Sequence, residues 1–198
     1  MKKSKYTPYD CFENIYLIDY DKLSLDNKKV IIFDLDNTIM PYHIKRPTQK
    51  IIDFMQSLKD KGFIVILLSN SPKKRIEVIG ELLGIDYFYR AMKPFKKGYK
   101  EVLSKYKDYK KDEFVCIGDQ LITDVFGARR VGIDCILVKP IFLDNEHWYT
   151  KINRMNERRI IKKFRNTNPV VYTKIYNIRG DIKNWLRNVM AVAPKFNF

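Results

Sequence analysis

Apolar runs of strand length alternate with amphipathic segments of helix length along most of this 198-residue chain. Short runs of β-branched and aromatic residues predict buried strands at 30–34, 64–68, 87–89, 114–117 and 134–138. Apolar positions at helical spacing predict helices near 48–61, 73–83, 97–107, 122–131 and 147–165. Because strands and helices alternate through short connections, we expect an α/β fold, a three-layer doubly wound parallel sheet with helices on both faces.

The two ends of the chain have less regular patterns. Residues 6–29 are expected to form an irregular lead-in that packs on the sheet through five apolar side chains, Tyr16, Leu17, Ile18, Leu23 and Leu25. We therefore expect one domain over 1–165, with 1–29 as its lead-in, and a basic C-terminal extension over 166–198 without an assigned role. Within this extension, 170–172 has the pattern of a short strand and 181–190 that of a short amphipathic helix.

The most informative residues follow the first predicted strand, where Asp34, Asp36 and Thr38 form a D-x-D-x-T cluster. The spacing of the two acids lets both project into one crevice while Leu35 points into the core. Two neighbouring carboxylates repel each other and need a cation or a shared proton, and carboxylate oxygens are ligands that Mg²⁺ prefers. The cluster therefore indicates a nucleophile, a proton-transfer group and a metal, although acidic pairs of this kind are often only turn residues.

Three later strands end in polar residues that match this chemistry. Ser69 and Asn70 end the second strand before a helix, where a hydroxyl and free N–H groups suit a phosphate, although both are also ordinary N-cap residues. Lys93 follows the third strand, where its charge can reach a phosphate and balance the carboxylates. Asp119 and Asp124 follow the fourth strand; Asp124 either ligates through water, orients the lysine or only starts a helix.

The formal charge of +15 is unevenly distributed. Residues 151–198 hold twelve Lys or Arg residues and two acidic residues, a charge of +10, which leaves +5 for the first 150 residues. Such a basic arm suggests an anionic partner, namely lipid headgroups, nucleic acid or an acidic protein.

Cysteine usage and hydropathy narrow the class of protein. Cys11, Cys116 and Cys135 have no C-x-x-C spacing, which is typical of a reduced, cytoplasmic protein, and His43 and His147 are expected at the surface. No signal peptide is evident, and the longest apolar run is far shorter than the ~20 residues that cross a bilayer, so we do not expect an integral membrane protein.

The chain resembles the haloacid dehalogenase (HAD) superfamily of aspartyl phosphatases. The resemblance rests on four motifs at successive strand ends, D-x-D-x-T, Ser-Asn, Lys-Pro and G-D-x-x-x-x-D. More narrowly, they resemble the YqeG branch of the type IIIA phosphatases, which is similar to the mitochondrial phosphatidylglycerophosphate phosphatases. The resemblance covers about residues 8–165 and implies a Rossmann-like HAD fold and phosphomonoester hydrolysis with Mg²⁺.

The resemblance also implies a role for each matching residue. Asp34 is the nucleophile that forms an aspartyl-phosphate, and Asp36 is the acid and base. Asp34, Asp119 and the backbone carbonyl of Asp36 hold Mg²⁺. The phosphoryl group is bound by Ser69, Asn70 and Lys93. Lys93 is also a catalytic residue, because its charge stabilises the phosphoryl oxygens during the reaction. Thr38 and Asp124 support them.

The substrate stays open at this point. Asp34, Ser69 and Lys93 lie too close in sequence for an inserted specificity domain, so we expect a capless, open site for a bulky or surface-bound substrate. The basic segment 151–165 and an apolar stripe of Trp148, Ile152 and Met155 either dock on an anionic membrane or are solvated on a helix packed against the sheet.

The favoured substrate by resemblance is phosphatidylglycerophosphate, which implies phospholipid metabolism and a cytoplasmic protein that is peripheral at the inner membrane surface. The alternatives are a phosphatase of soluble phosphosugars or of nucleic-acid ends and, in another class, a basic RNA- or ribosome-associated binding module on a HAD scaffold.

Overall fold

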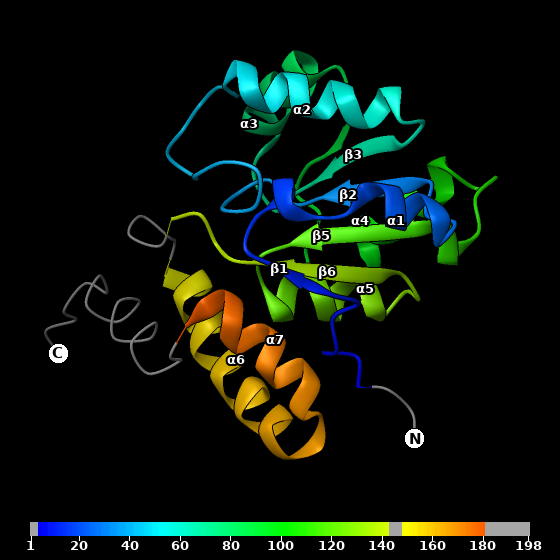
Figure 1. The fold of residues 1–198 in the computed structure, drawn as a ribbon. Helices are drawn as coiled ribbons and strands as arrows, with labels where there is room; N and C mark the ends of the chain where they lie inside the picture. Colours follow the sequence, from blue (N-terminus) through cyan, green and yellow to red (C-terminus); the bar gives the residue numbers. More distant parts are fainter. Residues whose placement is uncertain (1–3, 143–147, 181–198) are drawn as a thin grey trace, which may run out of the picture.

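The computed structural model describes residues 4–142 and 148–180 of the chain (Figure 1). Its centre is a six-stranded parallel sheet in the order β1-β6-β5-β2-β3-β4, which confirms the predicted parallel sheet. The strands are β1 (Cys11–Phe12), β2 (Val30–Phe33), β3 (Ile64–Leu68), β4 (Asp86–Phe88), β5 (Phe114–Gly118) and β6 (Asp134–Val138). Strand β1 lies inside the segment that we predicted to be irregular, and it extends the sheet beside β6.

Helices connect the strands at nearly the predicted positions. They are α1 (Tyr20–Leu25), α2 (Gln49–Asp60), α3 (Lys73–Leu83), α4 (Lys96–Lys105), α5 (Gly127–Arg129), α6 (Trp148–Thr167) and α7 (Pro169–Arg179). Gly84 ends α3 in the left-handed conformation, with φ of 60°, where a residue without a Cβ is least strained. The helix predicted over 122–131 is instead a π-helical turn, Leu121–Phe126, followed by the short α5.

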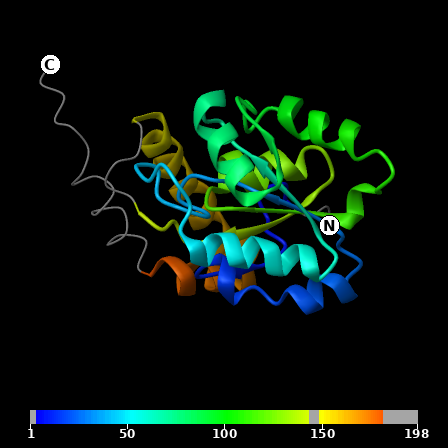
Figure 2. The same ribbon diagram turned by 90° about the horizontal axis from the view of Figure 1, so that it is seen from above.

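The sheet separates two hydrophobic cores. In β2, Ile31 and Phe33 pack with α1, α2 and α3, whereas Val30 and Ile32 face α4 to α7. Figure 1 shows α2 and α3 on one side and α6 with α7 beside β1 and β6, and Figure 2 shows α2 (cyan) and α4 (green) on opposite sides of the strands. A parallel sheet covered on both faces explains why the strands are continuous apolar runs.

The lead-in packs through a different set of side chains than we predicted. Ile18 and Leu23 are buried as expected, together with Ile15 and Tyr20. The prediction was wrong for Leu17 and Leu25, which are 58% and 87% exposed, whereas Tyr16 packs edge-on against Phe54 of α2, with ring centroids 4.8 Å apart. The 3₁₀ turn Ile15–Leu17 and helix α1 give the segment a regular backbone, in which Leu17 and Leu25 are on the solvent side.

Residues 170–172 are helical, so the strand predicted there is wrong. Asn168 caps α7 by accepting the N–H of Val171 (3.3 Å), and Pro169 occupies the first turn, where its missing N–H costs nothing. Val171, Ile175 and Ile178 then bury one face of α7 in the same core as α6. The predicted helix at 181–190 lies outside the described residues.

Helix α6 buries a face other than the one with Ile152 and Met155 of the predicted apolar stripe; the side chain of Trp148, its third member, lies outside the described part of the chain. Ile152 and Met155 are each 47% exposed, while Arg154, Glu157, Ile161 and Phe164 are buried. The buried face of α6 packs beside α7 and the π-helical turn Leu121–Phe126, and the side chains of five other basic residues are exposed, namely Arg158, Arg159, Lys162, Lys163 and Arg165. Within the described residues, no helix is both long enough and apolar enough to cross a membrane.

No specificity domain interrupts the fold between residues 34 and 93, all of which the structure describes. The chain from β2 to β3 forms only a loop and α2, and the chain from β3 to Lys93 forms only α3 and β4. The capless architecture is therefore confirmed.

Candidate active site

The polar residues at the strand ends converge where the strand order reverses. Strand β2 lies between β3 and β5, with Phe33 level with Leu67 and Ile117. Asp34, Ser69 and Asp119 follow these three strands and therefore meet at one edge of the sheet. Ligands bind at this switch point in open α/β sheets.

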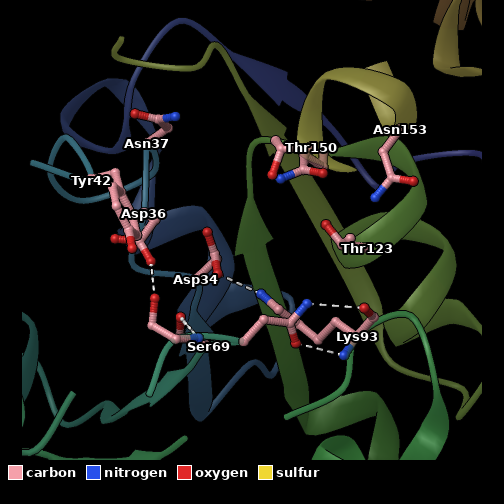
Figure 3. Close-up of a pocket in the computed structure, with 12 residues that line it drawn as sticks. Asp34, Asp36, Asn37, Tyr42, Ser69, Lys93, Thr123, Thr150 and Asn153 are labelled. Carbon is pink, nitrogen blue, oxygen red and sulfur yellow. Dashed lines mark hydrogen bonds and ion pairs between the residues drawn. The ribbon is translucent and has the colours of Figure 1, made fainter. Parts of the chain in front are cut away.

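A cavity of about 140 Å³ opens at this edge, room for a phosphoryl group and a few waters. Its lining residues are Asp34, Asp36, Asn37, Tyr42, Ser69, Asn70, Ser71, Lys93, Gln120, Thr123, Thr150 and Asn153. In Figure 3, Asp36, Asn37 and Tyr42 lie on one side and Thr123, Thr150 and Asn153 on the other, with Asp34 between them.

Lys93 provides a fixed positive charge at the bottom of the cavity. Its Nζ donates to Asp34 Oδ1 (2.5 Å) and to Asp124 Oδ1 (2.6 Å). Burial opposes the charge, but the carboxylates of Asp124 and Asp34 outweigh this effect and raise the pKa of Lys93. The ammonium group therefore stays charged beside Asp34.

Asn70 holds the backbone of Lys93 in place. Its Nδ2 donates to the Lys93 carbonyl (3.0 Å), and its Oδ1 accepts the Lys93 N–H (2.7 Å). Both polar ends of the side chain are thus engaged, which fits a positioning role better than the direct phosphate contact that we predicted for Asn70. Ser69 Oγ accepts the N–H of Ser71 (3.1 Å), so its own hydroxyl hydrogen can be donated into the cavity.

Three buried carboxylates form a cluster in which a cation fits. Oxygens of Asp34, Asp119 and Asp124 all lie within 4.8 Å of one another. Burial, with the nearby acids adding to it, raises the pKa of Asp34, and burial also raises the pKa of Asp124. An all-oxygen, anionic donor set of this kind suits Mg²⁺ and similar hard ions.

Asp124 has the most hydrogen bonds of the three acids. Besides Lys93 at Oδ1, its Oδ2 accepts the N–H of Gln120 (3.1 Å) and the hydroxyl of Thr123 (3.2 Å). The π-helical turn brings Thr123 and Asp124 inward, because its wider ring adds a residue to the turn. Its ion pair with Lys93 places Asp124 where it can orient that lysine, one of the roles left open by the sequence.

Asp119 is held by the C-terminal helices. Arg154 of α6 forms an ion pair with Asp119 Oδ2, and both side chains are fully buried. Arg179 of α7 donates to the Asp119 carbonyl (2.7 Å) and pairs with Glu157 (3.0 Å), which itself accepts the N–H of Ile122 (3.1 Å). One oxygen of Asp119 is thereby fixed while the other, Oδ1, lies 3.5 Å from the hydroxyl of Thr38.

Asp36 lies in the same cavity, but its carboxylate points away from the three-acid cluster. Its Oδ2 accepts the hydroxyl of Ser71 (2.5 Å), and its Oδ1 accepts Nη2 (2.7 Å) and Nε (3.1 Å) of Arg75. Thr38 Oγ1 lies 3.3 Å from Asp34 Oδ2. The two acids of the D-x-D-x-T cluster therefore have different partners, Lys93 and Thr38 for Asp34, and Ser71 and Arg75 for Asp36.

Several residues around the cavity were missed by the sequence reasoning. Thr150, Asn153, Arg154 and Glu157 come from one face of α6, and Arg75 comes from α3. The sequence did contain a signal for the buried face of α6, because its four residues have helical spacing and lead to the buried Ile161 and Phe164. The exposed residues Ile152 and Met155 have the same kind of spacing, so the pattern alone did not show which face is buried.

Comparisons with known proteins agree with this geometry. The haloacid dehalogenase-like hydrolase family matches residues 42–132. The Bacillus subtilis (strain 168) protein named "Probable phosphatase YqeG" is 37% identical over 161 residues, which cover 81% of this chain and 92% of that protein. The glyceraldehyde 3-phosphate phosphatase of Pyrococcus furiosus is 31% identical over 91 residues, 41% of this chain and 38% of that protein.

A solved structure, the cobalt-bound deoxy-D-mannose-octulosonate 8-phosphate phosphatase YrbI of Haemophilus influenzae, has a TM-score of 0.47 and 17% identity. The match covers 65% of this chain and 76% of that one. A relative named as a phosphatase thus aligns with four fifths of this chain. The chain belongs to the haloacid dehalogenase-like hydrolases and is a phosphatase of that family.

Proposed function

We propose that this phosphatase hydrolyses phosphomonoesters with Mg²⁺ through an aspartyl-phosphate on Asp34. The observation that carries the proposal is the convergence of Asp34, Asp119, Asp124 and Lys93 in one buried cluster, of which Asp34 and Lys93 line the cavity. Asp34 and Asp119, with the backbone carbonyl of Asp36, would hold the ion. A bound Mg²⁺ would neutralise charge on the phosphoryl oxygens.

In the proposed reaction, a carboxylate oxygen of Asp34 attacks phosphorus, and the bond from phosphorus to the leaving oxygen breaks. The leaving oxygen takes a proton from Asp36. Water then attacks phosphorus, Asp36 removes its proton, and the bond to Asp34 breaks to release phosphate. Lys93 and the hydroxyl of Ser69 stabilise the phosphoryl oxygens throughout, because an anionic nucleophile approaches an anionic group only where positive charge is fixed.

The metal requirement gives the first prediction. Removing divalent cations with EDTA abolishes phosphate release from a chromogenic phosphate ester, and added Mg²⁺ restores it. Asp119→Asn raises the Mg²⁺ concentration for half-maximal activity by at least about tenfold, because a ligand charge is lost. Full activity of the wild type after exhaustive chelation would contradict the proposal.

A control separates loss of the metal ligand from loss of the fold. Asp108→Asn removes an equal charge from an exposed position after α4 and leaves the Mg²⁺ dependence unchanged. Direct titration of each folded variant with Mn²⁺, followed by electron paramagnetic resonance, reports the affinity independently of turnover.

For the physiological substrate, we favour phosphatidylglycerophosphate from the resemblance to the type IIIA phosphatases. The solvated basic face of α6, which includes Arg158, Arg159, Lys162 and Lys163, supports contact with an anionic membrane surface, where each basic residue contributes ~1 kcal/mol. The partial match to a glyceraldehyde 3-phosphate phosphatase instead favours a soluble phosphosugar.

A substrate panel distinguishes these candidates. It compares phosphate release from phosphatidylglycerophosphate in mixed micelles, soluble sugar phosphates, nucleotides and end-phosphorylated oligonucleotides. We expect the highest kcat/KM for the lipid. A preference for a soluble sugar phosphate, with no co-sedimentation on anionic vesicles, would replace the lipid assignment without affecting the phosphatase assignment.

A further inference from the structure

A second, larger hollow adjoins the catalytic cavity. This groove has a volume of about 730 Å³ and lies between the loop 41–47 and the first turns of α3. Its volume is in the range of small-molecule sites. Because the fold has no specificity domain, the groove is well placed to contact the rest of a substrate.

The groove begins where a leaving group would leave the cavity. Tyr42 lines both spaces, and Arg75 lines the groove while it binds Asp36, the proposed proton donor to the leaving oxygen. A group that has just been protonated by Asp36 therefore lies at the mouth of the groove.

Arg75 also holds the two walls of the groove together. Its Nη1 donates to the carbonyl of Ile44 (2.7 Å), and its guanidinium lies over the ring of Tyr42, 5.1 Å from the centroid. The loop is thus tied to α3 from inside, so the groove exists before any ligand arrives.

The charges in the groove are unbalanced. Arg75 is neutralised by Asp36, but Lys45, Arg46 and Lys74 form no ion pair with any residue in 4–142 or 148–180. These three cations line a space that contains no acidic side chain among its described lining residues, and whose walls also include Tyr42, Pro72 and Val78. Three cations around apolar walls are complementary to a multiply charged anion on an organic body.

We propose that this groove is a leaving-group subsite and that the preferred substrate carries a second phosphate group on its leaving group, held by Lys45, Arg46 and Lys74. This inference rests on the proposed function, since the first phosphate is the one attacked by Asp34. A soluble bisphosphate and a lipid with a phosphodiester headgroup share this chemistry.

The test compares two soluble substrates, an alkyl monophosphate and the matching alkanediol bisphosphate. For the wild type we expect kcat/KM to be about tenfold higher for the bisphosphate, since three exposed charge contacts each contribute modestly. Lys45→Gln/Lys74→Gln lowers this ratio to about three, because Arg46 remains and two equivalent phosphates alone give a statistical factor of two, and it leaves kcat for the monophosphate unchanged.

The control variant, Lys100→Gln/Lys107→Gln, removes the same charge from exposed positions on and after α4, and its ratio stays at the wild-type value. Equal losses in both variants, or a wild-type ratio no higher than two, would overturn the subsite. The same double variant is also assayed with phosphatidylglycerophosphate in micelles. If it lowers kcat/KM for this lipid as well as for the soluble bisphosphate, the groove binds a phosphate from either source.

A chromogenic ester keeps the two proposals separate. If the wild type hydrolyses it without any preference for the bisphosphate, only the subsite fails. If the wild type hydrolyses neither the chromogenic ester nor the bisphosphate, the proposed function fails. Calorimetric binding of the bisphosphate to the inactive Asp34→Asn protein then tests the groove independently of turnover: binding weakened about threefold by Lys45→Gln/Lys74→Gln supports it, and equal binding overturns it.

Discussion

Replacing Asp34 by Asn is expected to reduce the turnover of a phosphate ester by about 10⁵-fold or more, to the detection limit. The amide keeps the size of the side chain but is a poor nucleophile, and loss of a nucleophile alone costs about 10⁶ in a well-studied hydrolase. Phosphomonoester hydrolysis is also among the slowest uncatalysed reactions, so little background rate remains. The measurement is phosphate release at saturating Mg²⁺.

The stability of the same variant shows whether the loss is chemical. Burial and neighbouring acids raise the pKa of Asp34, so its ionised form is disfavoured in the fold, and a neutral amide leaves Lys93 paired with Asp124. The melting temperature is therefore expected to be unchanged or higher. An active Asp34→Asn protein, or one that loses activity only because it unfolds, would contradict the nucleophile assignment.

Replacing Arg179 by Met is expected to lower the free energy of unfolding by about 3–5 kcal/mol. The change removes the ion-pair partner of the fully buried Glu157, and breaking a buried ion pair from one side costs this much. It also removes the hydrogen bond to the Asp119 carbonyl, so activity falls as well. Urea unfolding measures the stability, and the shift in melting temperature is expected to be about 10 °C.

Two further variants make this prediction specific. Glu157→Gln/Arg179→Met removes both charges while a side-chain oxygen remains for the N–H of Ile122, so it recovers most of the lost stability. Arg158→Met changes an exposed arginine on α6 and has little effect. If Arg179→Met were as stable as Arg158→Met, the buried network would not support the fold.

The sheet and much of the cavity could be predicted because their signals are local. The apolar runs of β2, β3, β5 and β6 are almost entirely buried, and in a parallel sheet all strand ends lie at one edge, so Asp34, Ser69 and Asp119 could be brought together from order alone. Lys93 had a weaker signal, since one lysine in a lysine-rich chain means little. Only its position after β4 distinguished it.

The contribution of α6 could not be predicted in the same way. Arg154 and Glu157 look like solvated charges in a basic helix, because burial of a lone charge is costly. They are buried here because their partners come from distant parts of the chain, Asp119 after β5 and Arg179 in α7. Which of the two faces of α6 is buried therefore depends on these long-range contacts, because both faces have the same helical spacing in the sequence.

The central claim, a covalent phosphoryl intermediate on Asp34, is tested most directly by trapping it. The enzyme is mixed with substrate and Mg²⁺, quenched in acid within one turnover, reduced with borohydride and digested for peptide mass spectrometry. Borohydride converts a phosphorylated aspartate to homoserine, and we predict this conversion at position 34 alone. Conversion at another aspartate, or rapid phosphate release with position 34 never converted, would contradict the account.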